Sequence, residues 1–251
     1  MANIELLRIV SMMMVVMLHY LGKGGLLPET TGAMTVNGYV AWGMESLCIV
    51  AVNVYMLISG YFLVESGFKG RRILELLCQV LFYTILVPLV LILVGVLPAS
   101  IFNIYHILQT VLPVQMEHYW FITAYVIMYL LSPILSVAAK SMSKEQLRGT
   151  IIALLLFFAV SKSILPFELA IDKQGYDGLW FVCVFLVAAY MRLYGIPFFT
   201  NGGKGRRGIL CYLAGCAGIY GLMLLVRLIY LKTGSLDHFI DSTYHYNHVL
   251  N

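Results

Sequence analysis

The chain has 251 residues, of which 61% are hydrophobic and 11% are charged, and its mean hydropathy is +0.89. A soluble domain of this composition would expose large apolar patches, so the sequence excludes a soluble protein and predicts an all-α integral membrane protein. The net charge of +4 would suggest acidic partners in a soluble protein. In a membrane protein the positions of Lys and Arg matter more than their sum, and we expect no nucleic-acid partner.

Apolar runs long enough to cross a bilayer predict about seven transmembrane helices in one polytopic bundle. They lie near residues 4–21, 45–64, 73–97, 119–138, 149–165, 179–194 and 208–231. Every second connection is rich in Lys and Arg, whereas the other connections hold only scattered lysines. The positive-inside rule therefore places the N-terminus in the cytoplasm.

The first predicted span contains three ionisable side chains, Glu5, Arg8 and His19. At about 100° per residue, Arg8 and His19 lie within about 20° of the same helix face and about 16 Å apart along the axis. Glu5 joins that face. Ionisable residues in a membrane helix normally face the bundle interior or a watery cavity, so this face is expected to line a site. The alternatives are an Arg8 that snorkels to lipid headgroups and a His19 that only bonds a neighbouring helix.

The first basic connection places Lys69, Arg71 and Arg72 within four positions. Such a cluster suits a phosphate-bearing ligand at the cytoplasmic face. Alternatively, it serves only to set the topology.

The predicted outer mouth of the fourth span carries Glu117, His118 and Trp120. Glu117 and His118 can assist His19, or they form a solvated loop end. Trp120 fits an interfacial aromatic belt or a rim that faces carbohydrate. The segment before them, residues 99–118, has a pattern that suits a helix lying flat at the interface.

The C-terminal segment spaces Asp241, His245 and His248 by four and three residues. These side chains would group as metal ligands only on a helix, which the sequence does not indicate, so we expect no metal. Seven spans would leave the C-terminus outside. We therefore expect one transmembrane domain over residues 1–251 that is incomplete at its C-terminus.

The opening of the first span, with Arg8 and His19 separated by ten residues, resembles the membrane-bound acyltransferase family 3. Residues 52–63, which include Asn53 and the run from Ile58 to Phe62, resemble the second helix of that family. The basic stretch 69–73 resembles its first inner loop, and residues 119–125 resemble its fourth span.

The resemblance implies a membrane O-acyltransferase of a bacterial-type plasma (inner) membrane, in a fold that usually has more spans than are found here. Such an enzyme takes an acyl group, commonly acetyl from cytoplasmic acetyl-CoA, and transfers it to a hydroxyl of a cell-surface or lipid-linked glycan. Membrane lipids, acyl-CoA and the saccharide acceptor are the expected partners.

Under this interpretation His19 and Arg8 are the catalytic candidates, with His19 acting as a general base or as a transient acyl carrier. His19 must be neutral in either role, so activity should fall as it becomes protonated. The candidates for binding acyl-CoA phosphates are Arg8, Lys69, Arg71 and Arg72. The candidates for contacting the acceptor are Glu5, Asn53, Glu117, His118 and Trp120.

Two other classes of function stay open from the sequence. A polytopic transporter or glycan flippase would use Arg8 and His19 to bind substrate or relay protons without covalent chemistry. A non-catalytic membrane scaffold is the third possibility.

Overall fold

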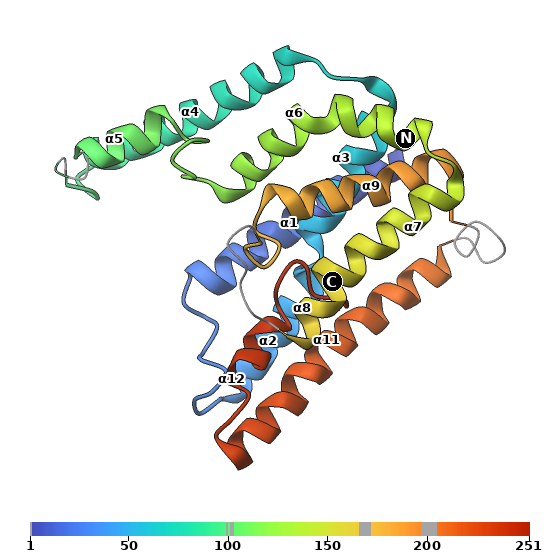
Figure 1. Cartoon of the computed structure of the whole chain (residues 1–251). Helices are drawn as coiled ribbons and strands as arrows, with labels where there is room; N and C mark the ends of the chain where they lie inside the picture. The colour runs from blue at the N-terminus through green and yellow to red at the C-terminus, as the bar shows by residue number, and fades with distance from the viewer. Residues whose placement is uncertain (1, 99, 101–102, 166–171, 197–204) are drawn as a thin grey trace.

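The computed structural model describes residues 2–98, 100, 103–165, 172–196 and 205–251 (Figure 1). The regular elements in these ranges are helices, which confirms the all-α class. They are α1 (Ala2–Lys23), α2 (Val36–Cys48), α3 (Ala51–Ser66), α4 (Gly70–Leu93), α5 (Ile104–Val111), α6 (Trp120–Ser141), α7 (Lys144–Leu155), the π-helix η2 (Leu156–Val160), α8 (Ser161–Ile164), α9 (Gly178–Tyr194), α11 (Arg206–Thr233) and α12 (Asp237–Ser242).

Six helical stretches of the described chain are long and apolar enough to cross a membrane. They cover residues 2–23, 36–66, 70–93, 120–141, 144–164 and 206–233. The apolar helix α9, with 17 residues, is shorter. The chain is therefore a polytopic helical membrane protein, and each of the predicted spans coincides with a helical stretch.

The second span begins earlier than the sequence predicts, at Val36 instead of position 45. Thr35 starts α2 by accepting a hydrogen bond from the backbone N–H of Gly38. The polar residues Asn37 and Glu45 interrupt the apolar run, so hydropathy alone places the start too late.

The helices alternate in direction, and one end of the bundle collects basic side chains. α1 and α4 begin at this end, whereas α3 and α6 finish there. We call it the basic end; it carries Lys69, Arg71, Arg72, Lys140 and Lys144. The opposite end, where α6 begins and α12 lies, is called the far end.

The helix α9 lies at the centre of the bundle and packs against α3, α6 and α7 (Figure 1). Phe181, Phe185 and Ala188 are completely buried there. α3 approaches α9 closely at Gly60, where a Cβ atom would lie only 2.9 Å from the Cβ of Ala188. Small residues allow such close approach of helices, which is why this position of α3 lacks a side chain.

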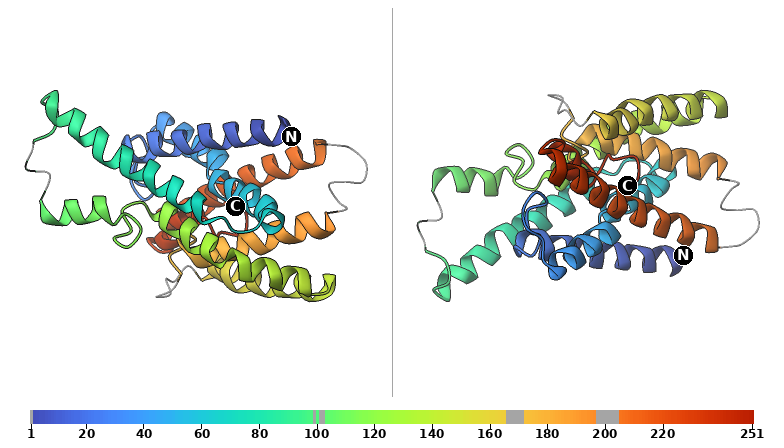
Figure 2. Two further views of the ribbon diagram at one scale, coloured as in Figure 1. Left: turned by 90° about the horizontal axis from the view of Figure 1, so that it is seen from above. Right: turned by 90° about the horizontal axis from the view of Figure 1, so that it is seen from below.

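The helix α4 extends away from the bundle and buries only Val80 and Thr84 (Figures 1 and 2). Its remaining apolar side chains are largely exposed, as expected for a helix surface that faces lipid. α5 follows it as a short helix, capped by Asn103, within the segment predicted to lie at the interface.

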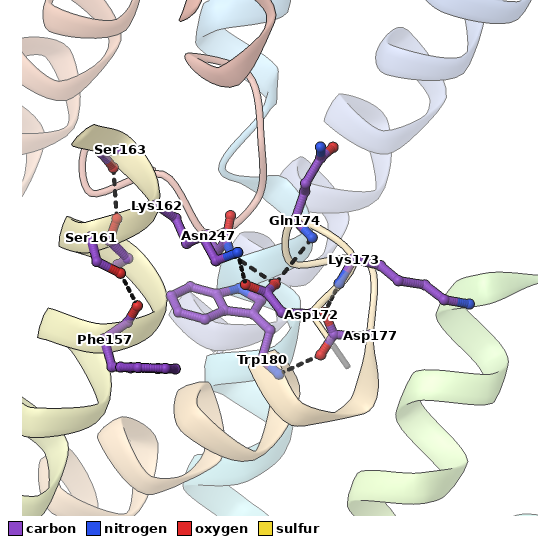
Figure 3. Close-up of polar contacts among 11 residues, drawn as sticks. Phe157, Ser161, Lys162, Ser163, Asp172, Lys173, Gln174, Asp177, Trp180 and Asn247 are labelled. Carbon is purple, nitrogen blue, oxygen red and sulfur yellow. Dashed lines mark hydrogen bonds and ion pairs between the residues drawn. The ribbon is translucent and has the colours of Figure 1, made fainter. Parts of the chain in front are cut away.

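The C-terminal segment 243–251 folds back among the helices (Figure 1), and Figure 3 shows its Asn247 beside Asp172. Lys162 Nζ lies 3.1 Å from Asp172 Oδ2 in a buried ion pair. The other carboxylate oxygen of Asp172 accepts hydrogen bonds from the Gln174 N–H at 3.1 Å and the Asn247 side chain at 3.2 Å. This network ties α8 and the start of α9 to the end of the described chain.

Candidate functional site

A cavity of about 670 Å³ opens at the basic end between α1, α3, α6 and the first turn of α4. Its lining combines charged, aromatic and hydroxyl side chains. The charged residues are Glu5, Arg8, Glu65 and Arg72, the aromatic residues are Phe62, Tyr125 and Tyr129, and the serines are Ser59 and Ser66.

Arg8 enters the cavity from α1. Its Nη1 lies 2.8 Å from Glu5 Oε1, and its guanidinium carbon lies 5.5 Å from the ring centroid of Phe62. The Arg8 and Glu5 side chains are 37% and 61% exposed, so this ion pair is a weak one that an anionic ligand can displace. The Phe62 ring meanwhile keeps the guanidinium group in place.

Arg72 reaches the same cavity from the first turn of α4. The turn between α3 and α4 is short, because Gly67 ends α3 with a φ of +69°, a conformation that favours glycine. Arg72 Nη1 donates a long hydrogen bond, 3.5 Å, to Ser66 Oγ. Two guanidinium groups from distant parts of the chain thus line one cavity.

The other two predicted phosphate ligands do not line this cavity. Arg71 points away and forms an ion pair with Glu75 at 2.7 Å, with its side chain 88% exposed. Lys69 is held through its backbone by the hydroxyl group of Tyr129. Neighbouring cations in the sequence therefore have different surroundings in the structure.

His19 is exposed and lies near the C-terminus of α1, towards the far end of the bundle. Its Nδ1 lies 2.9 Å from the carbonyl oxygen of Val15. It shares a helix face with Arg8, from which it is about 16 Å away by helix rise. The structure therefore brings Glu5, Arg8 and Arg72 together and leaves His19 outside their cavity.

Asn53 lies in the core and not in this cavity. Its side-chain oxygen accepts a hydrogen bond from Trp180 Nε1 at 2.9 Å, and its amide nitrogen donates to the carbonyl oxygen of Tyr246 at 2.8 Å. It also borders a second, mostly apolar cavity of about 210 Å³ between α3, η2, α9 and the C-terminal segment. Asn53 thus joins α3 and α9 to the C-terminal segment.

Glu117 and His118 lie at the far end, where both have local partners. Glu117 pairs with Lys173 at 2.6 Å. The His118 ring lies 6.1 Å from that of His106 and 4.5 Å from that of Tyr119. Partial burial, with a smaller effect of His106, lowers the pKa of His118 below its ordinary value, which favours the neutral ring.

Trp120 packs in an aromatic cluster at the same end. It stacks on Tyr246 at 5.3 Å and contacts Tyr176 at 4.7 Å and Phe181 at 6.0 Å between ring centroids. Its indole therefore supports the C-terminal segment.

The metal alternative finds no support in the part of the chain that the structure describes, where no group of three His, Cys, Asp or Glu side chains could hold an ion. Helix α12 ends at Ser242, so His245 and His248 lie beyond it. Asp241 accepts a hydrogen bond from Thr30 Oγ1 at 3.0 Å.

Two tyrosines of α6 line the cavity although sequence reasoning did not single them out. Tyr125 and Tyr129 follow Phe121 at intervals of four residues, so the three rings lie on one face of the helix. This spacing is visible in the sequence. It was not decisive, because an aromatic stripe at helical spacing equally predicts core packing.

The family model of an acyltransferase domain, acyltransferase family 3, matches residues 1–250 of this chain. The chain belongs to acyltransferase family 3. It is therefore a membrane enzyme that transfers acyl groups. Comparisons with curated proteins and with solved structures found no match.

In this acyltransferase the cavity at the basic end has the character of a binding site. Two guanidinium groups can form paired, charge-assisted hydrogen bonds with an anion, and the aromatic rings offer flat apolar walls. The residues that line it include no His or Cys.

Proposed function

We propose that this acyltransferase binds acyl-CoA, with acetyl-CoA as the expected donor, in the cavity at the basic end. It transfers the acyl group to a hydroxyl of a cell-surface or lipid-linked glycan, with O-acetylated polysaccharide as the expected product. The protein lies in a bacterial-type plasma membrane with its N-terminus in the cytoplasm, where acyl-CoA is available. The observation that carries the proposal is the convergence of Arg8 and Arg72 on one cavity.

The donor assignment is supported by charge and size. Coenzyme A carries several phosphate groups, and Arg is the side chain best suited to bind phosphate through two parallel hydrogen bonds. The volume of about 670 Å³ is in the range of small-molecule sites. Because the Arg8–Glu5 ion pair is largely exposed, a phosphate can replace Glu5 at little cost.

The chemical step that fits these residues uses His19 as a general base. His19 takes the proton of the acceptor hydroxyl, whose oxygen attacks the thioester carbonyl carbon. A C–O bond forms and the C–S bond breaks. The proton then passes from His19 to the departing CoA thiolate, so charge and atoms balance. The position of His19 on the same face as Arg8 supports this role, since a donor held by its phosphates can extend along α1.

The donor site is tested by the binding of radiolabelled acetyl-CoA to membranes that contain the protein. Arg72→Gln removes a cation that lines the cavity, whereas the matched control Arg71→Gln removes an exposed neighbour. We expect about a tenfold or greater loss of affinity in the first variant and less than about a twofold change in the second. Equal effects of the two variants would contradict the assignment.

The acyl transfer step is tested with radiolabelled acetyl-CoA and candidate glycans. We expect His19→Ala to abolish labelling of the glycan, and His238→Ala, which replaces an exposed histidine on α12, to leave it unchanged. Full activity of His19→Ala would exclude His19 as the base. Movement of glycan across the membrane without any labelling would favour a transporter instead.

A further inference from the structure

A row of aromatic side chains runs along the bundle from the cavity towards the far end. The ring centroids of Tyr129 and Tyr125 are 6.0 Å apart, and those of Tyr125 and Phe121 are 6.2 Å apart, with both pairs stacked. Phe68 contacts Tyr129 at 5.2 Å, and Tyr55 of α3 contacts Phe121 at 6.4 Å. We call these five residues the aromatic ladder. Its α6 portion spans about 12 Å by helix rise.

The ladder begins where the two guanidinium groups lie. Tyr125 and Tyr129 line the same cavity as Arg8 and Arg72. α6 runs opposite to α1, so Phe121 lies nearer to the His19 end of α1 than Tyr129 does. A ligand that is held by its phosphates at the arginines and extends along α6 therefore moves towards the level of His19.

The hydroxyl group of Tyr125 distinguishes a binding surface from ordinary packing. Tyr129 is 1% exposed and uses its hydroxyl on the backbone of Lys69. Within the described residues no hydrogen-bond partner is found for the Tyr125 hydroxyl, although its ring lines the cavity. A phenylalanine would pack as well at this position. The Tyr125 hydroxyl is not among the buried unpartnered atoms of the described residues, so a ligand that enters the cavity can reach it.

We propose that the aromatic ladder is the surface on which the pantetheine arm of the donor lies, and that the Tyr125 hydroxyl donates a hydrogen bond to an amide carbonyl of this arm. This inference rests on the proposed function. The arm alternates short apolar segments with amide groups, so it matches a row of rings in which the Tyr125 hydroxyl borders the cavity. Tyr125 is accordingly a substrate-contacting residue that positions the thioester.

The test compares two probes, CoA and adenosine 3′,5′-bisphosphate, which carries phosphates and adenine but no arm. We expect Tyr125→Phe to weaken CoA binding about three- to tenfold, as for loss of one hydrogen bond, and to leave the bisphosphate unaffected. The control Tyr83→Phe, on the exposed surface of α4, should change neither. Phe121→Leu, at the other end of the ladder, should also weaken only CoA, because it removes ring surface without touching the arginines.

The outcomes separate this inference from the proposed function. Unchanged CoA affinity in Tyr125→Phe, or equal weakening of both probes, would overturn the role of Tyr125 while the donor site stands. If the wild-type protein binds neither probe, the proposal of a donor site is wrong, and the proposed role of the aromatic ladder is wrong with it. A selective loss of CoA affinity supports both.

Discussion

The hydroxyl group of Tyr129 bonds twice to the backbone of Lys69, accepting from its N–H at 3.0 Å and donating to its carbonyl oxygen at 3.2 Å. Lys69 directly precedes α4, so these bonds fix the turn that carries Arg72 into the cavity. A buried residue of α6 thereby controls the geometry of a loop about 60 residues earlier in the chain.

Tyr129→Phe should therefore weaken both the fold and the donor site. The substitution keeps the ring but removes both hydrogen bonds to the backbone of the exposed residue Lys69, at a cost of about 0.5–1.5 kcal/mol for each bond lost. We expect a lower thermal unfolding temperature in detergent and a several-fold loss of acetyl-CoA affinity, with Tyr83→Phe as the control. A loss of stability with unchanged affinity would show that the turn positions Arg72 without Tyr129.

Gly60 should tolerate no larger side chain, because α3 and α9 touch there. A Cβ at this position would lie 2.9 Å from Ala188 Cβ and 3.3 Å from the backbone of Phe185. We expect Gly60→Ala to lower the free energy of unfolding by about 1–3 kcal/mol through overpacking. Gly149→Ala, on a part of α7 with open space, should instead stabilise by about 0.5–1 kcal/mol. Thermal unfolding of both variants checks the contrast, and a neutral Gly60→Ala would show that the helices can separate.

The buried ion pair between Lys162 and Asp172 should contribute much more to the stability of the protein than an exposed ion pair does. Asp172→Asn removes the carboxylate charge from a buried ion pair, and we expect a loss of about 3–5 kcal/mol. Glu117→Gln removes the exposed pair with Lys173 and should cost less than about 1 kcal/mol. The two are compared by unfolding in detergent. Similar losses would mean that the Lys162 environment is well hydrated.

The stability of the protein should fall as the pH drops from about 6.5 towards 4. Burial lowers the pKa of both His245 and His248 to about 4. At His245 the charge of Asp172 opposes this decrease in pKa, whereas the charge of Lys162 adds to it. At His248 the nearby His245 adds to the decrease. Unfolded histidine takes up its proton near pH 6.5, so within this window the unfolded state binds more protons. Acid therefore favours unfolding, and the loss is complete once the pH is below the folded-state values.

Unfolding temperatures at pH 7.5 and pH 5 measure this effect, and at pH 5 most carboxylates are still charged. We expect His248→Gln to reduce the difference between the two temperatures, and His238→Gln, at an exposed site, to leave it as in wild type. An identical difference in all three proteins would assign the acid sensitivity to other groups.

The sequence by itself determined the helical class, the approximate spans and the shared face of Glu5, Arg8 and His19. These properties depend on local features, namely the length of apolar runs and the 100° turn of each residue, so they can be read without knowledge of packing. The start of the second span was misplaced, since Asn37 and Glu45 mask an apolar segment whose beginning is set by the Thr35 cap.

Only the tertiary structure decided which of these side chains meet. Arg71 and Arg72 are neighbours in the sequence, yet one lines the cavity and the other pairs with Glu75 in solvent. Tyr125 lines the same cavity only because α6 packs beside α3 and faces α1. Such contacts join residues more than 50 positions apart, and they depend on how whole helices pack, which no local pattern of residues records.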